Sequence, residues 1–282
     1  MVMGFWRKLW HAPLAKLALG VIGVVLFAGI FAPFLAPHDP TMPHLEYKLS
    51  TPSTLFPLGA DHLGRCVLSR LLYGVRTTLF LAFFAMAITL SIGTLVGMLA
   101  GYFKRLDGLL MRLCDVMLSF PGELMILAIV GMLGPDVWNM FLAIILVKWA
   151  WYARMVRTLT LRYASMPYMD ASRLCGTPWH KTLKRHLLPL LATDIAVLAS
   201  LDMGAVILLI STLSFLGLGV QPPTPEWGMM LSEAKNIMLF YPEQMLPAGL
   251  AIILTVGAFN FLGDSIQNAL NPTHVLRQET RP

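Results

Sequence analysis

Six apolar runs, most of them long enough to cross a lipid bilayer, constrain the fold of this chain more than any other feature. They are Leu17–Ala36, Thr78–Tyr102, Val116–Leu133, Val137–Tyr152, Leu190–Leu218 and Met245–Ile266. The hydrocarbon core of a bilayer is about 30 Å thick and needs about 20 apolar helical residues, since lipid offers no partner for free backbone groups. The fourth run is the shortest and contains Lys148. We expect an all-α integral membrane protein with six transmembrane helices.

The composition agrees with a membrane protein and excludes several other classes. Of 282 residues, 57% are hydrophobic and only 13% are charged, whereas soluble chains carry about 25% charged residues. A net charge of +6 would indicate nucleic-acid binding only if the basic residues formed one face with interleaved aromatic residues. Here the basic residues lie between the apolar runs. The three cysteines, Cys66, Cys114 and Cys175, are far apart, which excludes a disulfide framework and a cysteine zinc site. Basic residues precede the first run, which is too long for a signal peptide, so we expect an uncleaved first span.

The distribution of Lys and Arg predicts that both termini lie in the cytoplasm. In that orientation, fifteen of the 21 basic residues fall on the cytoplasmic side and five on the other side, with Lys148 inside a span. Cytoplasmic loops of membrane proteins carry such an excess. Three stretches between the runs are long enough to have a role of their own, namely 37–74, 154–189 and 219–244, and the second is the most basic.

Residues 167–189 carry the start and stop signals of two short helices. Pro167 suits a first helical turn, and Gly176 suits the left-handed position that ends a helix. Thr177 is the expected cap of a second helix, with Pro178 in its first position, that meets Pro189 at the mouth of the fifth span. We expect a helix-turn-helix on the cytoplasmic face. The alternative, a plain basic loop, would account for the charges but not for the capping signals. Its outer surface would carry Trp179, His180, Lys181, Lys184 and Arg185.

The same stretch resembles a signature of known importers. The pattern Asp170-Ala171-Ser172-x3-Gly176-x9-His186-x-Leu188-Pro189 is similar to E-A-A-x3-G-x9-I-x-L-P in permeases of the ATP-binding-cassette (ABC) class. It departs from that signature at Asp170, Ser172 and His186. A histidine at the position of His186 is common in the peptide/nickel branch. The resemblance implies a coupling helix that docks on a separate ATPase. The residues expected at that contact are Asp170, Ala171, Ser172, Gly176, Thr177, Trp179, Lys181, His186 and Pro189.

The resemblance covers nearly the whole chain. It includes Pro37–Pro40, Leu58–Leu71, Ser214–Val220 with Trp227-Gly228, Gly263-Asp264 and Asn271-Pro272, although the family usually has Asp at the position of Cys66. It implies the type I ABC importer permease fold in a bacterial inner membrane. The expected parts are 1–75 (first helix and periplasmic segment), 76–268 (five helices with the coupling helix at about 167–189) and a cytoplasmic tail, 269–282.

Two details predict nickel or a metal chelate as the substrate, with di- or oligopeptides as the alternative. Both Lys148–Arg157 and Leu201–Gly204 resemble the C-type permease subunit of nickel importers. Ionisable residues inside spans are costly and are functional candidates, and carboxylates are reasonable nickel contacts. Glu123, Lys148 and Asp202 are therefore candidates for the substrate path, with pairing between helices as the alternative role of each.

Other sites and functions are less compatible with the sequence. His38, His44 and His62 match no known ligand set, so no metal site is expected. The chain has no phosphate-binding G-x-x-x-x-G-K-[ST] and no catalytic motif, so we expect a non-catalytic subunit without a cofactor, whose partner binds ATP and Mg. An ion-coupled secondary transporter is the rival class, but it would often show inverted repeats and has no use for a docking segment.

The resemblance also implies a set of partners. They are a second permease subunit in a heterodimer, two ATP-binding-cassette ATPase subunits or domains, an extracytoplasmic substrate-binding protein and membrane lipid, without nucleic acid.

Overall fold

The computed structural model describes residues 12–270. Asn271-Pro272, most of the expected tail 269–282 and the basic residues Arg7, Lys8, Arg277 and Arg281 lie outside the described residues. The described part is helical apart from its loops and one isolated bridge between Ala60 and Cys66. The helices are α2 (Pro13–Ile30), α3 (Ala32–Leu35), η1 (Leu45–Tyr47), α4 (Val67–Val75), η2 (Arg76–Phe80), α5 (Leu81–Tyr102), α6 (Lys104–Leu118), α7 (Gly122–Leu133), α8 (Val137–Ala164), α9 (Pro167–Leu174), α10 (Trp179–Thr182), η3 (Leu183–Leu187), α11 (Leu188–Phe215), α12 (Trp227–Lys235), η4 (Pro242–Met245) and α13 (Leu246–Leu270).

The expected membrane spans are present, and one of them is broken. Five stretches of residues 12–270 are long and apolar enough to cross a membrane: Pro13–Ile30, Val67–Tyr102, Val137–Ala164, Trp179–Phe215 and Pro242–Ala269. A sixth span results only if α6 and α7 are taken together, and these two helices meet at an angle of 77°. The third expected run, Val116–Leu133, is therefore not one helix. Pro121 lies at the break, where it disfavours helical backbone at the residue before it.

Two spans are longer than expected because short π-helical turns join them to their neighbours. The turn η2 connects α4 to α5, and η3 connects α10 to α11. We expected a boundary at Pro189, but the helix passes through it from Trp179 to Phe215. Proline lacks the N–H that a regular helix would use, and the wider turn just before Pro189 changes the hydrogen-bond pattern there.

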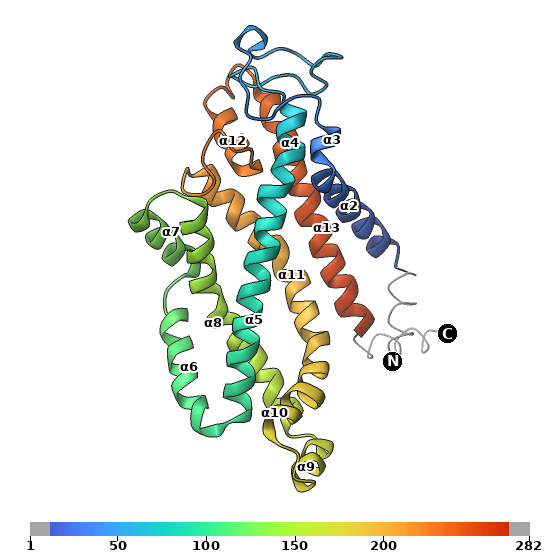
Figure 1. Ribbon diagram of the computed structural model, residues 1–282, viewed down its shortest axis with the longest axis vertical. Helices are drawn as coiled ribbons and strands as arrows, with labels where there is room; N and C mark the ends of the chain where they lie inside the picture. Colours follow the sequence, from blue (N-terminus) through green and yellow to red (C-terminus); the bar gives the residue numbers. More distant parts are fainter. Residues whose placement is uncertain (1–11, 271–282) are drawn as a thin grey trace, which may run out of the picture. The chain divides into compact units, whose positions relative to one another are not determined.

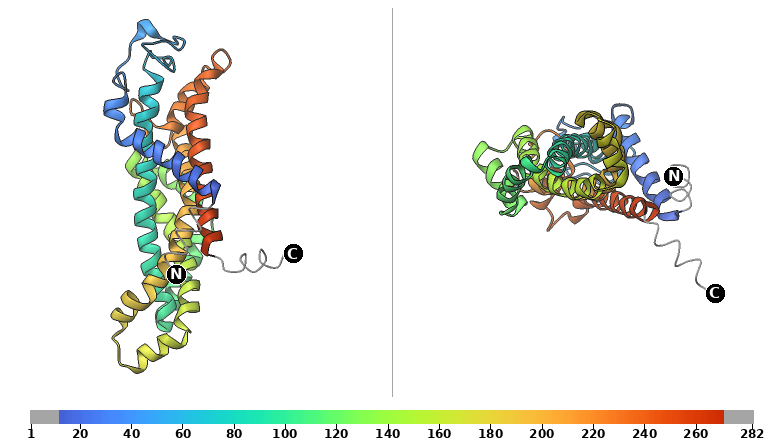
Figure 2. Two further views of the ribbon diagram at one scale, coloured as in Figure 1. Left: turned by 90° about the vertical axis from the view of Figure 1, so that its right-hand side faces the viewer. Right: turned by 90° about the horizontal axis from the view of Figure 1, so that it is seen from below.

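The described chain divides into two compact units that alternate along the sequence. Unit 1 contains residues 12–83, 134–140 and 200–270, and unit 2 contains 84–133 and 141–199. In unit 1, α2 packs obliquely along α13, as the blue and red helices of Figures 1 and 2 show. This unit also contains α4 with the long loop before it, the second part of α11 and the short helix α12.

Glycines on α5 set the packing of unit 2. A Cβ at Gly97 would lie 2.5 Å from the carbonyl oxygen of Ala153, and one at Gly101 would lie 2.6 Å from Thr160. Gly93 has an equally close neighbour in Tyr152. Because these glycines recur every four residues on one face, α5 approaches α8 closely, in the manner of small-residue interfaces between membrane helices.

A buried apolar cluster in unit 2 joins five helical elements of the chain. Met98 of α5, Val156 of α8 and Met169 of α9 pack with Leu183 and Leu187 of η3 and with Leu191 of α11. The exposed fractions of these side chains are at most 9%. The segment that follows α8 is therefore held against the membrane helices by its own apolar residues.

Candidate coupling segment and buried charge cluster

Residues 167–189, which we call the coupling segment, form the helix-turn-helix that the sequence predicts. The helix α9 begins at Pro167, and Gly176 has φ +68°, the left-handed conformation that glycine favours. Cys175 N–H donates to the Ala171 carbonyl at 3.0 Å, and Thr177 N–H donates to the Ser172 carbonyl at 3.2 Å. These two bonds satisfy carbonyl groups at the end of α9 and turn the chain towards α10.

The predicted cap of the second helix is wrong. Pro178, with φ −65° and ψ 143°, occupies the capping position of α10, and no side chain caps this helix. Thr177 therefore lies one position before the cap. The reason is that Pro178 already has extended backbone, so the first turn starts at Trp179.

The coupling segment exposes cations and buries three of its apolar side chains. Met169, Leu183 and Leu187 are buried in the cluster of unit 2. The five residues expected on the outer surface, Trp179, His180, Lys181, Lys184 and Arg185, are all exposed, as is His186. Trp179 is 51% exposed and its ring also packs edge-on against that of Phe103, with centroids 5.5 Å apart. The result is a basic surface with an exposed aromatic side chain on a firmly packed base.

The candidates for the substrate path lie on three different helices. Glu123 is exposed in the first turn of α7, and Lys148 is half-buried on α8. A Cβ at Gly122 would lie 3.4 Å from Val147, so the start of α7 lies against α8 beside Lys148. Asp202 is half-buried on α11 but belongs to unit 1, whereas Glu123 and Lys148 belong to unit 2. The start of α7, which carries Glu123, and Lys148 thus share one helix contact within unit 2.

The histidines of the loop between α3 and α4 pack as aromatic side chains. The ring of His38 stacks on Phe56 with centroids 4.6 Å apart, and it meets His44 edge-on at 6.4 Å. Within residues 12–270, no group of three His, Cys, Asp or Glu side chains is arranged to hold a metal ion.

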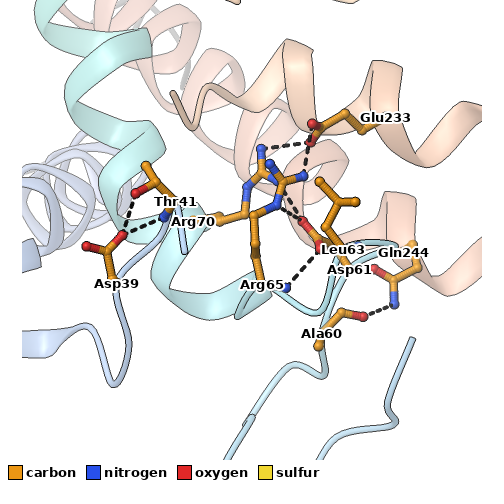
Figure 3. Close-up of polar contacts among 9 residues, drawn as sticks. All are labelled: Asp39, Thr41, Ala60, Asp61, Leu63, Arg65, Arg70, Glu233 and Gln244. Atoms are coloured by element: carbon orange, nitrogen blue, oxygen red, sulfur yellow. Dashed lines mark hydrogen bonds and ion pairs between the residues drawn. The ribbon is translucent and has the colours of Figure 1, made fainter. Parts of the chain in front are cut away.

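Sequence reasoning missed a buried cluster of four charges in unit 1, formed by Asp61, Arg65, Arg70 and Glu233 (Figure 3). The Asp61 carboxylate accepts from Arg65 Nε at 2.7 Å and from Arg70 Nη1 at 2.6 Å. The Glu233 carboxylate lies 2.9 Å from Arg65 Nη2 and 2.7 Å from Arg70 Nη2. The two arginine side chains are only 2% and 1% exposed. We call this set the charge cluster; it ties the loop before α4 to the helix α12.

The electrostatics of the charge cluster favour the ionised form of its aspartate. Burial acts to raise the pKa of Asp61, but the Arg70 and Arg65 guanidiniums, with the N–H groups of Arg65 and Leu63, outweigh it and lower that pKa. The ion pair of Asp61 with Arg65 could have been suggested by the sequence, because the two residues are only four positions apart. Glu233 lies 168 residues from Arg65, so no local pattern could have indicated it.

A second buried carboxylate fixes the other end of α12. Glu226 is fully buried and caps this helix by accepting from Met229 N–H at 2.8 Å. It also accepts from the Thr78 hydroxyl at 2.9 Å and from the Ser211 hydroxyl at 3.3 Å. Burial raises the pKa of Glu226, because its hydrogen-bond donors are neutral. Helix α12 is thus anchored by Glu226 at its start and by Glu233 near its end.

Comparison with known proteins links this arrangement to one family. The profile described as "Binding-protein-dependent transport system inner membrane component" matches residues 93–274, and that of "N-terminal TM domain of oligopeptide transport permease C" matches residues 3–52. The metal-staphylopine import system permease protein of Staphylococcus aureus is 42% identical over 259 residues, which cover 92% of this chain and 90% of that protein.

Two further relatives have different stated substrates. The glutathione transport system permease protein of Pectobacterium atrosepticum is 39% identical over 274 residues, covering 95% of this chain and 91% of that protein. The nickel transport system permease protein of Escherichia coli K12 is 36% identical over 258 residues, covering 91% of this chain and 93% of that protein.

Proposed function

Because this chain belongs to the inner membrane components of binding-protein-dependent transport systems, and is a multi-pass permease subunit of an ABC importer, we propose that its coupling segment docks on a separate ATPase. The observation that carries the proposal is the two-sided packing of this segment. Its exposed surface presents Trp179, Lys181 and neighbouring cations, while Met169 and Leu187 bind it to the membrane helices. A movement imposed on the exposed side is therefore transmitted to the spans.

The proposed assembly is the one that membership of this family implies. This subunit supplies half of the translocation path, a different permease supplies the other half, and two ATPase subunits or domains bind ATP and Mg. We place the coupling segment and both termini in the cytoplasm, since fifteen of 21 basic residues then lie there. An extracytoplasmic binding protein would deliver the substrate on the side of the loop 37–66. The division at 75/76 and 268/269 into a first helix with its loop, a five-helix domain and a tail belongs to this proposal.

Variants of Gly176 test the coupling role with a matched control. A built Cβ at Gly176 meets no atom within 4 Å, so only its φ of +68° restricts the residue there. Asparagine tolerates this conformation, whereas proline cannot adopt it. In the reconstituted importer, we expect Gly176→Asn to keep transport per ATP hydrolysed and Gly176→Pro to lose most of it.

A charge reversal at Lys181 tests the docking surface itself. We expect Lys181→Glu to uncouple ATP hydrolysis from transport, while Lys48→Glu, at an exposed lysine of the loop before α4, leaves coupling unchanged. Wild-type coupling in both Gly176→Pro and Lys181→Glu, with normal membrane insertion, would refute the proposal.

We propose nickel or a metal chelate as the substrate, with a small peptide as the second candidate. The metal-staphylopine and nickel relatives support the first, and the glutathione relative supports the second. The purified importer with its binding protein would be assayed for ATP hydrolysis with Ni²⁺ alone, a Ni²⁺ chelate, glutathione or a dipeptide. Stimulation by the peptides alone would decide for the second candidate.

Asp202 is the residue that we propose for the substrate path. It lies half-buried within the longest span, on α11, where an ionisable side chain is costly unless it has a role. We expect Asp202→Asn to lower uptake or change metal selectivity, with Asp264→Asn, at an exposed position of α13, as the control. Unchanged uptake and selectivity in Asp202→Asn would show that this carboxylate only joins helices.

A further inference from the structure

Unit 1 contains a large apolar hollow to which the proposed importer function assigns no role. It has a volume of about 990 Å³ and lies between α2, the first part of α13 and the loop that contains residues 49–58. Leu17 and Val24 of α2 and Leu246, Leu250 and Leu254 of α13 line it, and all five side chains are more than half exposed. These helices belong to Pro13–Ile30 and Pro242–Ala269, which are long and apolar enough to cross a membrane, so lipid can reach the hollow.

The polar groups of the hollow lie at its ends. Lys16 lies in the first turn of α2, and the loop end carries Ser50, Thr51, Tyr241, Glu243 and Gln244. An apolar cavity stays free of water, whereas the loop end offers hydroxyl and amide groups. The lining therefore suits an amphiphile, with its tail between α2 and α13 and its headgroup at the loop end. A helix of a second permease is the other occupant, which the experiment below distinguishes from lipid.

One polar group at the loop end is unpartnered. The Ser50 hydroxyl oxygen is buried and has no hydrogen-bond partner among the described residues. A buried hydroxyl without a partner is costly, and a phosphate oxygen of a headgroup would satisfy it. Glu243 is the charged lining residue at this end, so its carboxylate favours a headgroup with an ammonium and disfavours a purely anionic one.

We propose that this hollow binds the acyl chains of a phospholipid with an ammonium-bearing, zwitterionic headgroup, whose phosphate meets Ser50 and whose ammonium meets Glu243. The proposal needs only that the chain spans a membrane, so it stands or falls separately from the coupling role and the substrate.

Two glycines of α2 provide a variant and its matched control. A built Cβ meets no atom within 4 Å at either Gly20 or Gly23, but only Gly20 lines the hollow. Gly20→Leu would therefore fill part of the hollow, while Gly23→Leu makes the same change in helix propensity outside it. Glu243→Gln, at an exposed position, tests the headgroup preference without altering the helices.

The experiment uses the intact importer in proteoliposomes that contain phosphatidylethanolamine or phosphatidylglycerol with a photoreactive group in one acyl chain. Labelled residues are mapped by mass spectrometry. We expect phosphatidylethanolamine to label Leu17–Val25 and Leu246–Leu254 several-fold above the rest of the lipid-facing surface. Gly20→Leu should lose this excess, Gly23→Leu should keep it, and Glu243→Gln should abolish the preference over phosphatidylglycerol.

Three outcomes would overturn the proposal. They are labelling no higher than elsewhere on the spans, equal labelling by the two lipids in the wild type, and photo-cross-links from these residues to the second permease instead of to lipid.

Discussion

The charge cluster and the coupling segment use charged residues in opposite ways. In the cluster, Arg65 and Arg70 are buried and each meets the carboxylates of Asp61 and Glu233. In the coupling segment, Lys181 and its neighbouring cations are exposed, and apolar side chains such as Met169 provide the attachment. Charges that satisfy one another inside a protein fix a structure, whereas charges on an exposed surface remain available to a partner. The number of charges in a stretch therefore does not reveal its role, since burial decides whether the charges fix a structure or face a partner.

Removing one arginine of the cluster should have the largest effect on stability. Arg70→Met leaves Asp61 and Glu233 buried with too few cations, and breaking such a pair costs about 3 to 5 kcal/mol. Thermal unfolding of the purified subunit in detergent would measure the loss, with the exposed Lys48→Met as the control at about 0.5 kcal/mol or less. Equal stability of the two variants would mean that the cluster does not hold the loop to α12.

Truncating the apolar anchor of the coupling segment should have the next largest effect. Met169 is fully buried, so Met169→Ala opens a cavity at a cost of about 2 to 5 kcal/mol. The loss should appear as faster proteolysis within residues 165–189, while Met155→Ala, at a 39% exposed position, should change little. If Met169→Ala left the cleavage rate unchanged, the segment would not depend on the cluster of unit 2 for its position.

The buried carboxylates of Asp61 and Glu226 should respond oppositely to pH. The pKa of Asp61 is lowered in the folded chain, so its stabilising contribution is present above the unfolded value of 3.8 and is lost as the pH falls through the folded value. The pKa of Glu226 is raised, so its contribution is present below the unfolded value of 4.5 and is lost as the pH rises through the folded value.

Amide substitutions separate these two contributions. Between pH 7 and pH 5, Asp61→Asn should remain less stable than the wild type, because it removes an ionised partner of two arginines. Glu226→Gln should lose less, since its donors are neutral hydroxyl and N–H groups. Unfolding measured at several pH values would test the order, and a greater loss in Glu226→Gln would reverse the comparison.

Substitution of an exposed cation should have the smallest effect on stability. Lys181→Glu should change the unfolding free energy by about 0.5 kcal/mol or less, since Lys181 is exposed. Its proposed effect on coupling would then be separate from any effect on folding. A large loss of stability in this variant would show that Lys181 holds the segment together and would weaken the contrast with the cluster.

The parts of this molecule that depend on local sequence could be predicted, and the parts that depend on distant contacts could not. The length of the apolar runs predicted the membrane helices. Pro167 and Gly176 predicted the start of the first helix of the coupling segment and the turn after it. The irregularity beside Pro121-Gly122 was expected, but neither its 77° angle nor the continuous helix through Pro189 was predicted, because a proline is compatible with either outcome until the neighbouring turns are known.

The charge cluster shows the same limit most clearly. Glu233 becomes the partner of Arg65 and Arg70 only when α12 packs beside the loop before α4. The close approach of α5 to α8 through Gly97 and Gly101 likewise needed the partner residues Ala153 and Thr160. The candidates for the substrate path, Glu123, Lys148 and Asp202, stay predictions.

Cross-linking from Cys175 tests the central claim, contact between the coupling segment and an ATPase, most directly. Cys175 is exposed beside Gly176, whereas Cys66 and Cys114 are buried, so a thiol reagent with a photoreactive arm should label Cys175 alone among the cysteines of this chain. In the assembled importer, illumination should join this subunit to the ATPase, and Cys175→Ser should abolish the product. Efficient labelling of Cys175 without any cross-link to the ATPase, in a complex that still transports, would contradict the account.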